Sequence, residues 1–355
     1  MTTPKARAAA FCARFGLRLP IVMAPMAGAS PASLAIAVAN AGGMGAGGVL
    51  TMQPAAIAAW SAEFRAGSNG AFQLNTWIPD PAPLRDAAHE ARLRAFLGQF
   101  GPDVPTDAGD AALVDFEAQC AAMLAARPAV ISSIMGLYPP EFVAAMRADG
   151  IAWFANVTTV AEACAAEAAG ADAVVAQGAE AGGHRGAFIA GDAERAAVGL
   201  FALLPAVVDA VKIPVVATGG VADARGIAAA LMLGASAVQI GTGLLRTPEA
   251  KLSPAWAAAL AATRPEDTMI TRAFSGRAGR GIATAYARAA AVGPAPAPYP
   301  VQRGLTTAMR EAAVKAGDVQ HMQAWAGQSA AMARAEPAGD LLRDLWAKAS
   351  ALLGD

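Results

Sequence analysis

Residues 215–242 read VVATGGVADARGIAAALMLGASAVQIGT. Two short, mainly apolar runs, Val215–Gly220 and Ala237–Thr242, flank a stretch with the composition of a helix, Asp223–Gly234. A strand, a helix and a second strand in this order predict two parallel strands joined by a crossover helix. The run Val215–Ala217 contains no polar residue, which is typical of a parallel sheet that is covered on both faces.

The same alternation extends in both directions along the chain. Six more strands are predicted at Ile21–Pro25, Met44–Leu50, Ala71–Thr76, Ala129–Gly136, Ile151–Val157 and Ala173–Gly178. The remaining helices are predicted at Ser30–Gly42, Pro54–Gly67, Pro139–Gly150, Thr158–Gly170, Leu200–Lys212 and Pro254–Thr263. Ser30 is the expected N-cap of the first of them. Eight such units favour an α/β fold, a closed (β/α)8 TIM barrel, and an open doubly wound sheet is the alternative.

Two regions do not follow this repeat. Residues 79–128 contain helical stretches around His89–Phe100 and Ala111–Arg127, and residues 264–355 contain a loop rich in Pro and Ala at Gly293–Pro300. We expect residues 1–78 and 129–263 to form the barrel, and residues 79–128 and 264–355 to form a smaller, mostly helical subdomain over its mouth.

Composition narrows the class of protein. The chain has 355 residues, a net charge of −1, 55% hydrophobic residues and 15% charged residues. This composition excludes a disordered chain. The near-zero net charge gives no attraction to nucleic acid or to an anionic membrane. Residues 19–62 carry no charge, but prolines and glycines interrupt them, so no bilayer-spanning helix is expected there.

Cysteine and histidine usage points to a reducing compartment and away from a metal site. The three cysteines are far apart and form no pair, so the cytoplasm is the expected location. The three histidines, His89, His184 and His321, have no metal-ligand spacing, so no metal is expected.

In a (β/α)8 barrel the active site lies where the strands end and the following loops begin. The first strand ends in Ala24-Pro25-Met26, and the third ends near Asn75. The seventh ends in Thr218-Gly219-Gly220, and the eighth ends in Gln239–Thr242. Glycine-rich turns after these last two strands expose backbone N–H groups at the usual phosphate position of this fold.

The segment after the sixth strand, Ala176–Gly186, reads AQGAEAGGHRG. Its glycine pair allows a backbone course that projects the His184 side chain over the pocket. An imidazole near its ordinary pKa acts as a general base or as a hydrogen-bond donor at neutral pH. Glu180 is expected to anchor the loop, whereas Arg185 is expected either to attract an anion or to be solvated.

Taken together, these segments resemble the nitronate monooxygenases of class I over nearly the whole chain. The matching segments are Ala24-Pro25-Met26, Asn75, Ala176–Gly186, Thr218-Gly219-Gly220, Gln239–Thr242, Ser275-Gly276-Arg277 and Gln323–Gln328. The resemblance implies FMN in the barrel mouth. It further implies that FMN contacts Met26, Asn75, Gln177, Gly182, Gly219, Gly220, Gln239, Ile240, Gly241 and Thr242. His184 would face the substrate, and Tyr299 and Ser275 would belong to the substrate pocket and its lid.

The resemblance implies oxidation of alkyl nitronates, such as propionate 3-nitronate, by O2 to a carbonyl compound and nitrite. The alternatives are an NAD(P)H-dependent FMN reductase of quinones or enoyl thioesters, and a non-catalytic FMN-binding protein. The sequence differs from some relatives at the lid, where Arg303 and Thr307 replace a tyrosine and a lysine. The expected partners are a small nitronate and O2, and a homo-oligomer is compatible with the sequence.

Overall fold

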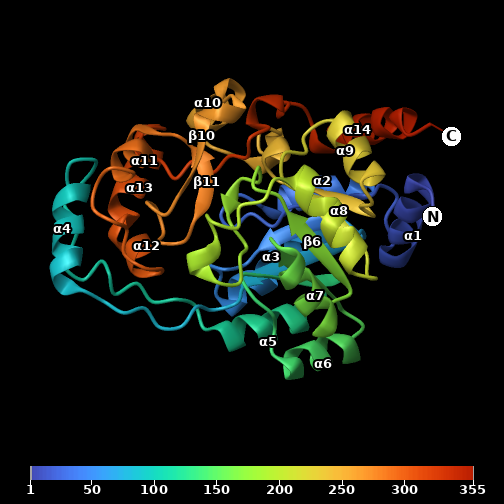
Figure 1. The fold of residues 1–355 in the computed structure, drawn as a ribbon, viewed down its shortest axis with the longest axis horizontal. Helices are drawn as coiled ribbons and strands as arrows, with labels where there is room; N and C mark the ends of the chain where they lie inside the picture. The colour runs from blue at the N-terminus through green and yellow to red at the C-terminus, as the bar shows by residue number, and fades with distance from the viewer. Residues whose placement is uncertain (1, 355) are drawn as a thin grey trace.

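Eight parallel strands form the barrel that the sequence predicts, in a computed structural model that describes residues 2–354 (Figure 1). Their order around the barrel is β1-β9-β8-β6-β5-β4-β3-β2. A parallel bridge between Val22 and Met44 joins the two ends of this sheet, so the alternative of an open sheet is wrong. The strands are β1 Ile21–Met23, β2 Gly45–Gly48, β3 Phe72–Trp77, β4 Val130–Ile134, β5 Ala152–Val157, β6 Ala173–Gln177, β8 Val215–Thr218 and β9 Ala237–Ile240.

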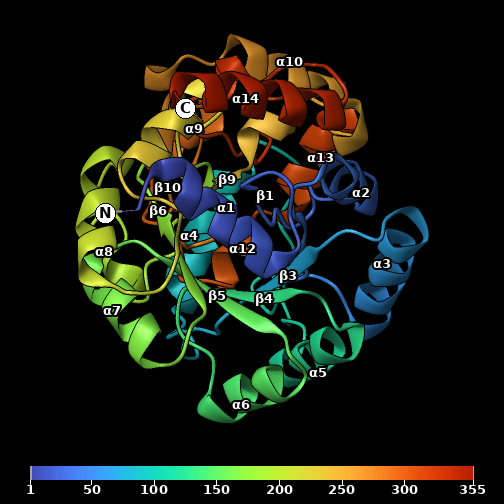
Figure 2. The same ribbon diagram turned by 90° about the vertical axis from the view of Figure 1, so that its right-hand side faces the viewer.

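The helices around the barrel include one that the sequence placed elsewhere. α14 (Ala338–Leu352) packs against both α9 and α2 and completes the ring between them (Figure 2). The expected eighth helix, Pro254–Thr263, is instead α10 (Pro254–Ala262), which packs beside η5 (Ala330–Met332). The other helices of the ring are α2 Ala32–Ala41, α3 Pro54–Gly67, α5 Phe116–Ala126, α6 Pro140–Ala148, α7 Val160–Ala168, α8 Leu200–Ala210 and α9 Ala224–Met232.

A helix before the first strand closes the amino ends of the strands. α1 (Pro4–Phe15) crosses this end of the barrel in Figure 2. The Phe11 and Phe15 rings lie 6.0 and 5.0 Å from the Phe154 ring, centroid to centroid. Burial of aromatic rings stabilises this closure. α1 and its aromatic rings therefore cover the amino ends of the strands.

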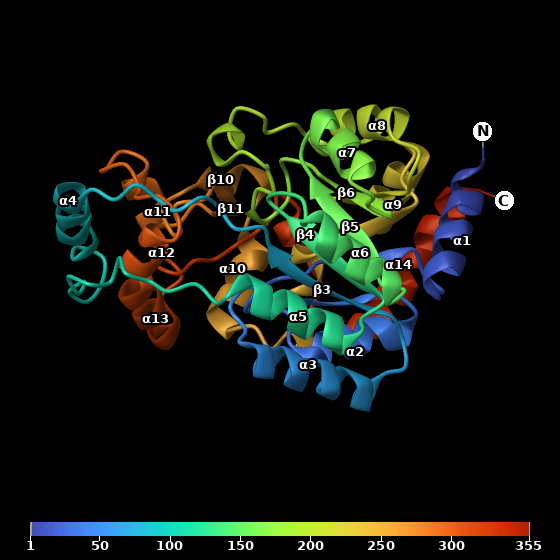
Figure 3. The same cartoon turned by 90° about the horizontal axis from the view of Figure 1, so that it is seen from below.

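An extension lies beyond those carboxyl ends (Figures 1 and 3). Its own apolar core includes Leu93, Leu97, Phe274, Tyr286 and Met309. It contains a hairpin that the sequence did not predict, to which the short β7 adds a third strand. The elements are α4 Ala87–Leu97, β7 Gly183–His184, β10 Thr268–Thr271, β11 Gly279–Ile282, α11 Ala285–Ala290, α12 Val301–Leu305 and α13 Thr307–Ala316.

The division of the chain at residues 78, 128 and 263 stays a prediction. Two elements of the expected subdomain nevertheless pack with the barrel. α5 packs on α3, and its Cys120 and Met123 belong to the main barrel core. Leu341 and Leu345 of α14 belong to the same core. Both helices bury an apolar face against the barrel, where more apolar surface is available than in the extension.

The expected N-cap at Ser30 is wrong. α2 begins at Ala32 with Pro31 as its N-cap, and no side chain caps it. The Ser30 hydroxyl instead donates to the Met26 carbonyl at 2.8 Å and accepts from the Gly48 N–H at 3.2 Å. Ser30 therefore holds the loop after β1 against β2. This loop carries Met26, one of the predicted site residues.

Candidate active site

A cavity of about 650 Å³ occupies the carboxyl ends of the strands. Loops of the barrel and side chains of the extension line it together. The predicted residues that line it are Met26, Asn75, Gln177, Gly182, His184, Gly219, Gly220, Gln239, Gly241, Thr242 and Ser275. Small-molecule sites are usually concave and contain a few polar groups that orient the ligand. The fold therefore brings together residues from opposite ends of the chain.

Glycine turns form one wall of the cavity. Gly219 and Gly220 have φ angles of +109° and +72°, which side chains disfavour. A Cβ on Gly219 would lie 3.0 Å from the Ala181 nitrogen. A Cβ on Gly182 would collide with the backbone nitrogen of Gly327. These glycines therefore let neighbouring segments of backbone pack closely, and this wall presents backbone to the cavity.

Amide side chains form the floor. Asn75 donates from Nδ2 to both the carbonyl and the hydroxyl of Ser132 at 3.0 Å. Its Oδ1 has no hydrogen-bond partner within residues 2–354 and is not sealed from the cavity. Asn156 also lines the cavity, and its buried Nδ2 makes no hydrogen bond to the described residues. The floor thus offers an acceptor to a polar ligand, with an unpaired, buried donor beneath it.

The Gln177 side chain holds the loop that carries His184. Its Nε2 donates to the His184 carbonyl at 3.0 Å, and its Oε1 accepts from the Gly186 N–H at 2.8 Å. The Glu180 carboxylate accepts from the Leu200 N–H at the start of α8, at 2.9 Å. This geometry agrees with the structural role expected of Glu180. Both residues keep the loop in one course from β6 to α8.

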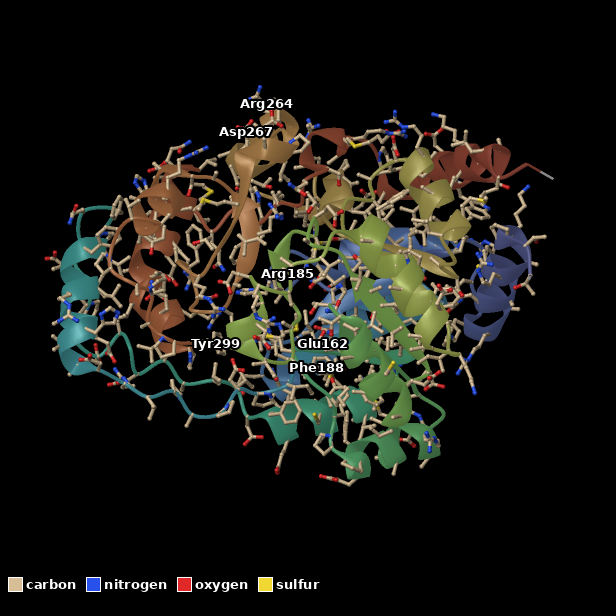
Figure 4. The ribbon with its side chains drawn as sticks, viewed as in Figure 1. Glu162, Arg185, Phe188, Arg264, Asp267 and Tyr299 are labelled. Atoms are coloured by element: carbon tan, nitrogen blue, oxygen red, sulfur yellow. The ribbon has the colours of Figure 1, made fainter. Side chains whose placement is uncertain are left out.

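Both expectations for Arg185 are wrong. The Arg185 side chain is buried, 1% exposed, and lies in the interior (Figure 4). It donates to the carbonyls of Gly178 and Gln177 at 2.6 and 3.2 Å. Burial lowers its pKa to about 10. Arg185 therefore braces the loop from within and reaches neither solvent nor a ligand in the cavity.

A carboxylate on α7 holds the far part of this loop. The Phe188 N–H donates to Glu162 Oε1 at 2.8 Å, and the two residues lie side by side in Figure 4. Glu162 Oε2 also accepts from the Thr158 N–H at 2.6 Å. The loop is thus tied to the helix ring on both sides of His184.

His184 lies in the short strand β7, which pairs with β11 in antiparallel register opposite Gly279. Its ring lies between two tryptophans. The Trp77 and Trp325 rings are 4.6 and 4.8 Å away, and both meet it edge to face at 72° and 66°. Nε2 lies 2.7 Å from Ser275 Oγ. The imidazole is therefore held in one orientation at the edge of the cavity.

Burial and neighbouring cations keep His184 neutral. Desolvation lowers its pKa most, and Arg277, Arg303 and Arg310 lower it further, to about 3. The expectation of an imidazole near its ordinary pKa is therefore wrong. At neutral pH the ring carries no charge, and it acts through one N–H and one lone pair.

The extension adds cations to the site, of which the sequence analysis named only Arg303, at the lid. Arg303, Arg310 and Lys315 line the cavity with a single carboxylate, Glu311. Arg310 is held by Gln323 Oε1 at 3.0 Å and by the Arg303 carbonyl at 2.9 Å. The half-buried Arg303 guanidinium has neither a hydrogen bond nor an ion pair to the residues that the structure describes. The roof of the cavity therefore carries uncompensated positive charge.

Comparison with known proteins shows which family has this architecture. A sequence model of the nitronate monooxygenase family matches residues 11–348. A nitronate monooxygenase of Pseudomonas aeruginosa is 40% identical over 344 residues, 94% of this chain and 97% of that one.

The chain belongs to the nitronate monooxygenase family. This family comprises flavin-dependent oxidoreductases. Among solved structures, the nitroalkane oxidase of Streptomyces ansochromogenes has a TM-score of 0.86 at 38% identity and covers 94% of this chain and 96% of its own. FabK of Thermotoga maritima has a TM-score of 0.76 at 26% identity and covers 97% of this chain and 96% of its own.

Two residues that the resemblance to nitronate monooxygenases selected do not line the cavity. Ile240 is 1% exposed in the barrel core. Tyr299 packs on Trp77 with ring centroids 5.2 Å apart, behind the cavity wall. Its buried hydroxyl makes no hydrogen bond to the described part of the chain. The contacts implied for Ile240 and Tyr299 stay predictions.

Some residues that line the cavity were missed although signals for them existed. Trp77 follows Asn75 by two positions, so both side chains leave β3 on the same face. Asn156 precedes the last residue of β5, as expected for a site amide. Trp325 lies inside the segment Gln323–Gln328 that supported the resemblance. Attention to residue types at strand ends could have identified the first two.

None of the helices within residues 2–354 combines the length and the hydrophobicity that crossing a membrane requires. Within the same residues, no three His, Cys, Asp or Glu side chains converge as metal ligands would.

Proposed function

We propose that this protein binds FMN at the carboxyl ends of its strands and oxidises alkyl nitronates, such as propionate 3-nitronate, with O2. The products would be a carbonyl compound and nitrite. One observation carries the proposal: a neutral imidazole, His184, faces a cavity whose roof has unpaired positive charge. A nitronate is an anion, so the positive charge favours it over a neutral or cationic substrate, and the imidazole can donate a hydrogen bond to it.

The lining of the cavity fits FMN. The turn at Gly219 and Gly220 presents backbone without side chains, which suits a phosphate. Gly241 and Thr242, in the next turn, would complete the phosphate site. The free Oδ1 of Asn75 and the unpaired Nδ2 of Asn156 suit the polar edge of a flavin ring. Met26 and Gly182 would pack against it.

When bound, FMN would supply the redox chemistry. The chain's own residues would bind and orient the substrate. His184 would donate a hydrogen bond to an oxygen of the nitronate. Arg303 and Arg310 would attract the anion and favour its charged form. The Trp77 and Trp325 rings would exclude water from the reacting carbon.

The first experiment identifies the cofactor. The purified protein is denatured, and the released flavin is separated and compared with FMN and FAD standards. We expect FMN in a ratio near one per chain. Recovery of FAD, or of no flavin from folded protein, would contradict the phosphate site.

The second experiment measures oxygen uptake and nitrite release with propionate 3-nitronate. We expect turnover with the nitronate in air and no rapid bleaching of the flavin by NADH without oxygen. Bleaching by NADH, without turnover of the nitronate, would favour the reductase. Flavin binding with neither reaction would favour the non-catalytic alternative.

A further inference from the structure

Ser275 is the residue of the extension that contacts His184 most directly. It lies between β10 and β11 and is 1% exposed. Its Oγ has three neighbours: His184 Nε2 at 2.7 Å, the Arg277 carbonyl at 3.2 Å and the Arg277 N–H at 3.3 Å. The arrangement of protons among these groups decides what His184 can offer to a ligand.

The proton count is limited. The Arg277 N–H can only donate, so it uses one lone pair of Ser275 Oγ. The single hydroxyl proton then goes either to His184 Nε2 or to the Arg277 carbonyl. A heavy-atom distance of 2.7 Å is typical of a hydroxyl donor, whereas ring and backbone N–H donors mostly lie 2.9–3.0 Å from oxygen. The shorter contact, to His184, therefore takes the hydroxyl proton.

The backbone around Ser275 is fixed on both sides. The Arg277 side chain, also 1% exposed, donates from Nε to Asp80 Oδ2 at 2.8 Å and from Nη1 to the Ala187 carbonyl at 3.1 Å. A second contact joins Arg277 Nη2 to Asp80 Oδ1. On the other side, the Thr306 hydroxyl donates to the Phe274 carbonyl at 2.6 Å. The hydroxyl therefore meets the imidazole from a rigid support.

We propose that Ser275 is a positioning residue that donates its proton to His184 Nε2 and so holds the imidazole in the tautomer protonated at Nδ1. Nδ1 has no partner within the described chain and is not sealed from the cavity. It therefore presents an N–H to the ligand and no lone pair.

This inference rests on the proposed function and restricts it. An N–H at Nδ1 binds an oxygen of an anionic nitronate, but it cannot remove the α-proton of a neutral nitroalkane. His184 would therefore act by hydrogen bonding alone. His184 would therefore not ionise a neutral nitroalkane, and a substrate that arrives already ionised suits this site.

The direct test is the tautomer in the purified protein with its natural cofactor content. Protein labelled with 15N-histidine gives long-range 1H–15N correlations that distinguish the protonated ring nitrogen from the unprotonated one. The chain has three histidines, so a His184→Gln variant assigns the His184 signals. We expect Nδ1 to be protonated at neutral pH, and protonation at Nε2 would overturn the proposal. This result does not depend on any turnover, so it is separate from a failure of the proposed function.

The second test removes the hydroxyl. In Ser275→Ala we expect His184 to shift toward the tautomer protonated at Nε2 and kcat/KM for nitronate to fall on the order of tenfold. Ser275→Thr keeps a hydroxyl and should retain the wild-type tautomer. Ser61→Ala, another buried serine, on α3, is the matched control and should change neither quantity. An unchanged tautomer in Ser275→Ala would overturn the positioning role even if activity falls.

Discussion

The two walls of the cavity differ in how they are built. The barrel wall consists of glycine turns and amides whose positions the strands set, such as Gly219, Gly220 and Asn75. The roof consists of side chains from the extension, such as Arg310, which Gln323 holds, and Trp325, which packs on His184. Backbone presented by a rigid sheet suits a cofactor that is always the same. A roof of charged and aromatic side chains suits the selection of a substrate. We therefore expect changes in the two walls to have separable effects.

The largest effect is expected on the barrel wall. Gly219→Asp should abolish most flavin retention, because the carboxylate repels a phosphate and the residue would need a positive φ angle. The flavin-to-protein ratio after gel filtration measures this loss. Gly191→Asp is the control, because a Cβ added at Gly191 would meet open space and its φ angle is not positive. A full flavin content in Gly219→Asp would place the phosphate elsewhere.

A change at His184 should separate the effect on turnover from the effect on flavin binding. His184→Ala should leave the flavin spectrum nearly unchanged and lower kcat/KM for nitronate. Loss of a charge-assisted hydrogen bond costs about 1.5–3 kcal/mol, which corresponds to roughly one to two decades. Oxygen uptake at matched flavin content measures the effect. An unchanged kcat/KM would make His184 a residue of the loop alone, without contact to the substrate.

Arg303 tests the roof with a smaller effect. Arg303→Gln should raise KM for propionate 3-nitronate by about tenfold, since a partly exposed guanidinium contributes less than a buried one. The flavin content should not change. Arg92→Gln, an exposed arginine on α4, is the control. If Arg303→Gln loses flavin but keeps its KM, the roof contributes to cofactor binding, and the separation of the two walls is wrong.

The smallest expected effect is on the pH dependence of the free energy of unfolding. In the folded protein the pKa of His184 is about 3, so the ring stays neutral above that pH. In the unfolded chain a histidine binds a proton below about pH 6.5. The unfolded state therefore binds more protons between these values, so this residue makes stability fall as pH decreases. For this one residue, the free energy of unfolding falls by about 1.4 kcal/mol for each pH unit of acidification.

Urea unfolding of wild type and His184→Gln between pH 6.5 and 5 tests this slope. The variant should lose less stability than wild type on acidification. Parallel curves would mean that His184 already binds a proton in the folded protein above pH 5.

The limits of sequence reasoning are visible in single residues. Strand ends are local, so Asn75 and the turn at Gly219 could be placed from the chain alone. Arg185 could not, because its burial depends on hydrogen bonds to the carbonyls of Gly178 and Gln177, and these require the loop after β6 to fold back so that β7 pairs with β11. The α14 helix was likewise missed as a barrel helix, since only its contacts with α9 and α2 show that it belongs to the ring.

By itself the sequence determined the eight strands, the glycine turns at their ends and the position of His184 after β6. Apolar periodicity and glycine placement express these features within a few residues, where backbone geometry is local. Only the tertiary structure decided the state of the imidazole. Its neutral charge and its contact with Ser275, 91 positions away, come from burial and from neighbours on another segment. The pKa of a group depends on what surrounds it in space. The order of residues near His184 in the chain does not show which groups those are.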